Sequence, residues 1–73
     1  MIKRRYFIAR VYANYEASVR TIEQVDEHRD QERAELERRR LDRAGEAEHC
    51  SLIVTAGGTW EEAERELKAR LGD

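Results

Sequence analysis

The chain has 73 residues, enough for one domain (residues 1–73) whose thin core leaves little material for a deep substrate pocket. Charged residues make up 41% of it and apolar residues 40%, a balance that excludes a disordered tail, while 14 basic and 16 acidic groups leave a net charge of -2. The single cysteine excludes an intramolecular disulfide framework and favours a reducing, cytoplasmic setting.

The amino-terminal residues 1–5 begin like a signal peptide, but Arg10 and three tyrosines interrupt the apolar run that follows. No small-residue cleavage site comes after it, and no stretch approaches the roughly 20 apolar residues that cross a bilayer. We therefore expect a cytoplasmic protein with no membrane partner.

The first predicted element is a strand over residues 5–15. β-branched and aromatic residues dominate it, and apolar positions recur with a period of two, which is typical of a half-buried strand. Its mostly apolar side consists of Phe7, Ala9, Val11 and Ala13.

Residues 16–44 contain no helix breaker and become strongly charged after Val19, Ile22 and Val25. A single helix over these 29 residues would be roughly 43 Å long at 1.5 Å per residue. A domain of this size has a diameter of roughly 30 Å, so a straight helix would extend beyond it.

Three outcomes remain open for this central segment. It can break near Asp26, with residues 19–25 forming a short helix or a third strand beside the first. Its second half can project into solvent, held by pairs such as Arg38 with Asp42. Alternatively, the projecting part can pack on a second copy or on a different protein. Its two leucines lie five residues apart, which fits a long coiled coil poorly.

The second predicted strand covers residues 49–56 and is centred on Leu52, Ile53 and Val54. Its continuous apolar run indicates burial on both faces or a central position in the sheet. The direction of pairing between the two predicted strands stays open, because the connection is long enough for a parallel or an antiparallel arrangement.

A helix after residue 59 is the best-marked element. Thr59 and Glu62 form a capping box, and Gly72 is placed to end the helix. Glu64 and Lys68 are an i,i+4 pair in the favourable order. The apolar stripe consists of Trp60, Ala63, Leu67 and Leu71.

These elements predict an α+β (or small α/β) fold. A two- or three-stranded sheet would be packed by the capped C-terminal helix and by a long charged central helix, in the order β-α-β-α.

Residues capable of chemistry are few. His49 and Cys50 are adjacent in a strand and point to opposite faces, so they are badly placed to share a proton. One cysteine and two histidines also fall short of a zinc set within one chain. The Gly57–Gly58 junction has the parts of a phosphate cradle, but the carboxylates of the first helical turn would repel an anion. We expect no catalytic residues, cofactor or metal, and hence no enzyme.

The sequence therefore favours a non-enzymatic protein-interaction module, a small regulator or inhibitor that docks on a larger protein or nucleoprotein complex. The charged central segment offers the surface, because too few of its side chains are apolar for the core to use them all. In size and chemistry the chain resembles phage-encoded inhibitors of host machinery such as anti-CRISPR proteins, a likeness that rests on no motif. The partner-binding residues expected from this segment are Arg29, Arg33, Leu36, Arg39, Arg40 and Arg43.

Two alternatives stay open. The first is a nucleic-acid-binding protein that uses the basic start of the first strand, where arginines could contact phosphates and tyrosine could stack on bases. The second is a homodimer with a structural or assembly role. The residues expected to bind nucleic acid are Lys3, Arg4, Arg5 and Tyr6.

Overall fold

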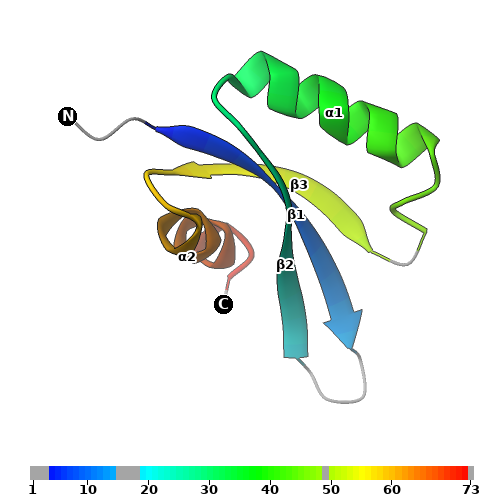
Figure 1. Ribbon diagram of the computed structural model, residues 1–73. Coiled ribbons are helices and arrows are strands. Elements are labelled where there is room, and N and C mark those ends of the chain that lie inside the picture. The colour runs from blue at the N-terminus through cyan, green and yellow to red at the C-terminus, as the bar shows by residue number, and fades with distance from the viewer. Residues whose placement is uncertain (1–3, 15–18, 49, 73) are drawn as a thin grey trace.

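Three β-strands and two helices make up the computed structural model, which describes residues 4–14, 19–48 and 50–72 (Figure 1). The strands form one antiparallel sheet, and α1 and α2 lie on its opposite faces. This arrangement confirms the predicted α+β class. In chain order the elements are β1 (Arg5–Asn14), β2 (Val19–His28), α1 (Gln31–Arg43), β3 (Ser51–Gly57) and α2 (Trp60–Arg70).

The central segment is divided into a strand and a helix. Residues 19–28 form β2, which pairs antiparallel with β1, so the third strand left open by the sequence is present. The order is β-β-α-β-α instead of the expected β-α-β-α, and the predicted long central helix is wrong. Asp30 caps α1 by accepting a hydrogen bond from the Glu32 amide at 3.0 Å. The 13-residue helix is roughly 20 Å long and lies over the sheet without projecting from the domain.

β1 is the central strand, in the order β2-β1-β3, and both of its pairings are antiparallel. Phe7, Ala9 and Val11, on the predicted apolar side, are buried, whereas Tyr6, Arg10 and Tyr12 on the other side are partly exposed. This pattern is that of the expected half-buried strand, except that Ile8 on the second side is also fully buried. β3 is an edge strand rather than a central one, yet Leu52 and Ala56, on the α1 side of the sheet, are both buried.

The larger core lies between the sheet and α2. Leu67 is fully buried against Ala9 and Val11. The Phe7 and Trp60 rings meet edge to face, with centroids 5.6 Å apart. The apolar stripe predicted for the C-terminal helix is therefore the surface that α2 packs on the sheet. Partly buried residues at the margin of this core are Ile22, Ile53, Trp60 and Leu71.

The junction of β3 and α2 is a tight strand-to-helix turn. A Cβ on Gly57 would lie 2.7 Å from the Ala63 amide nitrogen, so only glycine fits there. The Thr59 hydroxyl accepts from the Glu62 amide at 3.3 Å, and the Glu62 carboxylate accepts from the Gly58 amide at 2.9 Å. The predicted cap is confirmed, although Glu62 holds the amide of Gly58 instead of that of Thr59.

The face covered by α1 has a thinner apolar layer. Ile8 is fully buried on this side of β1, and Ala34 is the buried residue of α1. Most other α1 side chains are charged and at least partly exposed. No helix in the described ranges is long and apolar enough to cross a membrane.

Candidate functional site

One side of α1 faces away from the sheet. At 100° per residue, positions 32, 36, 39 and 43 lie opposite the buried Ala34, and positions 33 and 40 lie at the margin of the same side. We call this set the α1 outer surface. It comprises Glu32, Arg33, Leu36, Arg39, Arg40 and Arg43, all of which are exposed.

Leu36 is the large apolar residue that the fold leaves in solvent, with 61% of its surface exposed among the described residues. It lies in an open hollow of about 490 Å³ between α1 and the end of β2, which we call the Leu36 hollow. The fold thus places one apolar side chain at the centre of a charged helix face. The hollow is lined by His28, Arg33, Leu36, Glu37 and Arg40.

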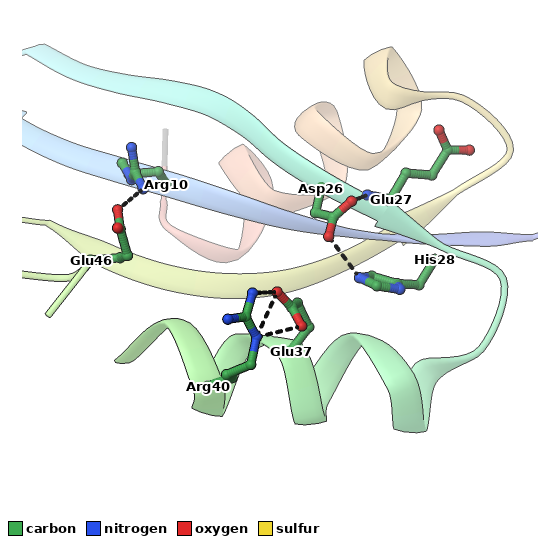
Figure 2. Close-up of polar contacts among 7 residues, drawn as sticks. All are labelled: Arg10, Asp26, Glu27, His28, Glu37, Arg40 and Glu46. Atoms are coloured by element: carbon green, nitrogen blue, oxygen red, sulfur yellow. Dashed lines mark hydrogen bonds and ion pairs between the residues drawn. The ribbon is translucent and has the colours of Figure 1, made fainter. Parts of the chain in front are cut away.

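Figure 2 shows two polar contacts that involve residues of the Leu36 hollow, one between Arg40 and Glu37 and one between His28 and Asp26. Arg40 Nε donates to both carboxylate oxygens of Glu37, at 3.1 and 3.0 Å, and His28 Nε2 lies 3.1 Å from Asp26 Oδ2. The hydrogen bond from Arg40 lowers the pKa of Glu37, and the same bond raises the pKa of Arg40. Both groups are therefore ionised at neutral pH, and the charge of Arg40 is partly offset within the chain.

The remaining arginines of α1 divide into two groups. Arg38, on the side toward the sheet, contacts Glu35 at 3.3 Å and Asp42 at 2.6 Å. The predicted pair of Arg38 with Asp42 is confirmed. Of the arginines in α1 and directly before it, four are exposed and have no ion-pair partner within the described ranges, so this part of the surface carries unpaired positive charge on a chain of net charge -2. They are Arg29, Arg33, Arg39 and Arg43.

The six residues expected to bind a partner are thus all exposed, and the structure brings three of them, Arg33, Leu36 and Arg40, to one hollow. Arg29 lies outside the helix, in the connection from β2. Sequence reasoning did not include Glu37 and His28 among the site residues. His28 is half-buried because it ends β2 opposite Tyr6 of β1, a position that only the strand pairing reveals.

The basic residues at the start of β1, unlike the unpaired arginines of the α1 outer surface, lie near acidic side chains. Arg5 lies 2.6 Å from Glu27 on β2, and Arg4 lies 3.8 Å from Glu66 on α2. Tyr6 is half-buried, and Lys3 is outside the described residues. The two arginines expected to bind nucleic acid therefore each have an acidic neighbour in the fold.

On both edge strands, side chains form hydrogen bonds with backbone groups. Arg70 donates to the Val54 carbonyl oxygen of β3 at 3.2 Å, and the Asp26 carboxylate accepts from the Glu27 amide of β2 at 2.8 Å. The register of β2 also shifts opposite Ile8 and Ala9 of β1. Bulges and charged side chains on edge strands oppose the addition of another strand.

Cys50 and Gly58, considered as candidates for catalysis or ligand binding, form hydrogen bonds within the fold. Cys50 is half-buried and its thiol donates to the Glu46 carbonyl at 3.4 Å, while His49 lies outside the described residues. At the glycine junction the amide of Gly58, which an anion would need, already binds Glu62. The part of the chain that the structure describes holds no group of three or more His, Cys, Asp or Glu side chains arranged to bind a metal ion.

The polar residue Arg10 is also enclosed. It extends from β1 to Glu46 at 3.2 Å, and its Nε is buried without a hydrogen-bond partner among the described residues (Figure 2). Its side chain is 20% exposed, and Glu46 belongs to the turn that follows α1.

No family model, no curated protein and no solved structure matches this chain.

Proposed function

We propose that this chain is a non-enzymatic protein-interaction module, a small regulator or inhibitor that docks on a larger protein through the α1 outer surface. The observation that carries the proposal is the exposed Leu36, set in a hollow on a helix face where Arg33, Arg39 and Arg43 have no ion-pair partner among the described residues. An apolar contact surrounded by a polar rim is the usual composition of a protein interface.

The residue types on this helix face support binding to protein. Arginine is enriched in interfaces and at hot spots, because its guanidinium forms paired hydrogen bonds and stacks on flat groups. An amphipathic helix that presents residues at i, i+3, i+4 and i+7 is also a recurring recognition element. Positions 32, 33, 36, 39, 40 and 43 follow this spacing.

The other candidate surfaces lack the composition of the α1 outer surface. Backbone groups on both edge strands of the sheet are hydrogen-bonded to side chains, and Arg4 and Arg5 have acidic neighbours. The polar hollow beside β3 has a volume of about 380 Å³ and is lined by groups of both charges, including Arg4, Glu66 and Arg70. None of these surfaces combines an exposed large apolar residue with unpaired charge of one sign.

A role as an inhibitor fits the small size of the chain, because one exposed helix face is sufficient to block a site on a larger assembly. The single cysteine supports a reducing compartment such as the cytoplasm as the place where it acts.

Site-specific photo-crosslinking in cells that naturally express the chain tests this proposal. A photoreactive residue at position 39 should give a defined protein adduct, whereas the same residue at position 65, exposed on α2, should not. Leu36→Asp should abolish the adduct, and the matched control Ala69→Asp on α2 should leave it unchanged.

Three results would overturn the proposal: no adduct from position 39, the same adducts from both positions, or an adduct that Leu36→Asp does not affect. An adduct removed by nuclease would instead support the nucleic-acid alternative.

A further inference from the structure

We infer that the α1 outer surface binds an acidic helical segment of a partner protein, with one apolar side chain of that segment against Leu36. This inference rests on the proposed function and adds the chemistry of the partner. It follows from the charges that the fold leaves unpaired around the Leu36 hollow.

The first step concerns the sign of the charge. Arg33, Arg39 and Arg43 are exposed and have no ion-pair partner in the described ranges, and Glu32 is the acidic residue among them. Guanidinium groups bind carboxylates in paired hydrogen bonds that are stronger than neutral ones. A partner surface rich in Asp and Glu therefore complements this face, while a basic one would be repelled.

The second step excludes a second copy of this chain as the occupant. In an antiparallel pair of α1 helices centred on Leu36, Arg33 of each chain would face Arg39 of the other. One attractive pair, Glu32 with Arg40, would oppose this repulsion, and Arg40 already binds Glu37. A parallel pair would place every arginine against its own copy, so repulsion dominates in both orientations.

The third step favours protein over nucleic acid. Leu36 is exposed at the centre of the surface, where a phosphate backbone offers it no apolar contact. A peptide segment can satisfy the arginines with carboxylates and bury Leu36 with an apolar side chain.

The spacing on α1 also predicts the pattern of the partner. An antiparallel partner helix should carry its apolar residue opposite Leu36. It should carry one acidic residue three positions before the apolar residue, opposite Arg39, and one three positions after it, opposite Arg33. It should carry another acidic residue seven positions before the apolar one, opposite Arg43. These offsets keep all four side chains on one side of the partner helix.

A synthetic helical peptide with this pattern, a central Leu and Glu at positions -7, -3 and +3 relative to it, is the probe. Its binding to the full chain can be followed by NMR titration, with shifts expected at residues of the Leu36 hollow and not on α2. Replacing the central Leu of the probe by Gln, or its Glu residues by Lys, provides matched controls. Both changes should weaken binding by roughly tenfold or more.

Variants of the chain complete the experiment. Leu36→Ala and Arg39→Glu should each weaken binding of the probe by roughly five- to tenfold, and Arg65→Glu on α2 should change it less than about twofold. Raising the salt concentration from 50 to 200 mM should also weaken binding.

Equal binding of the Glu and Lys probes, or insensitivity to Leu36→Ala, would overturn the inference. So would tighter binding to a DNA duplex than to the probe, or a dimer in light scattering that Leu36→Asp dissociates. If crosslinking finds a Leu36-dependent protein partner but the acidic probe does not bind, the partner chemistry alone is wrong. If both experiments fail, the proposed function fails as well.

Discussion

The two helices of this small protein pack on opposite faces of one sheet and use their side chains differently. α2 buries Ala63 and Leu67 completely and places Trp60 against Phe7. α1 buries Ala34 and leaves Leu36, its exposed leucine, in solvent. Both helices are capped at the N-terminus, so local capping does not distinguish them.

The difference separates a helix that stabilises the fold from a helix that offers a surface. The apolar stripe of α2 is used by the core, and its junction with β3 is held by Gly57 and by the Thr55 hydroxyl, which donates to the Ala63 carbonyl at 2.8 Å. α1 pairs several of its charged side chains within the chain but leaves Arg33, Arg39, Arg43 and Leu36 exposed to solvent. Substitutions in the two helices should therefore affect different measurements.

Truncation of one leucine in each helix should give the largest contrast. Leu67→Ala removes a fully buried side chain and should lower the free energy of unfolding by about 2–5 kcal/mol. The total free energy of unfolding of a domain of this size is roughly 4–11 kcal/mol, so this variant should be close to unfolding. Leu36→Ala should cost less than about 0.5 kcal/mol. Urea titrations followed by Trp60 fluorescence measure both, and equal losses would mean that Leu36 belongs to the core.

A smaller effect is expected where β3 meets α2. Gly57→Ala would place a Cβ 2.7 Å from the Ala63 amide nitrogen, which should force the helix away from the strand and cost about 1–3 kcal/mol. Gly45→Asn, after α1, is the matched control. Gly45 has a φ of +83° and open space around it, and Asn tolerates this conformation, so the loss should stay below about 1 kcal/mol. An unchanged free energy of unfolding in Gly57→Ala would contradict the close packing of β3 against α2.

The smallest effect concerns the Glu37–Arg40 pair and depends on pH. Because Arg40 lowers the pKa of Glu37, the pair stabilises the fold above the ordinary Glu value of 4.5 and loses this effect as the pH falls through the lowered pKa. Glu37→Gln should therefore be slightly less stable than the parent at pH 7, and this difference should vanish once the pH lies below the lowered pKa of Glu37. Urea unfolding of both chains across this range tests the sign. A difference that grows on acidification would contradict it.

The strongest local sequence signals led to correct predictions. The Thr59–Glu62 cap and the apolar stripe from Trp60 to Leu71 identified α2, because both features involve residues within a few positions of each other. The arginines and Leu36 of the expected partner-binding set are exposed as anticipated. Whether they bind a partner stays a prediction. His28 and Glu37 were missed, since their place beside Leu36 depends on contacts between β2 and α1.

The sequence by itself determined the class of the fold, the capped C-terminal helix and the excess of charge in the central segment, since composition and short-range periodicity encode these properties. Only the tertiary structure decided that residues 19–28 form a strand, because their β-branched residues allow strand or helix and pairing with β1 selects the strand. The same pairing shortened α1 and made β1 central. Long-range hydrogen bonds and the packing of a helix on each face of the sheet, which no local pattern specifies, thus determined which side chains remained exposed.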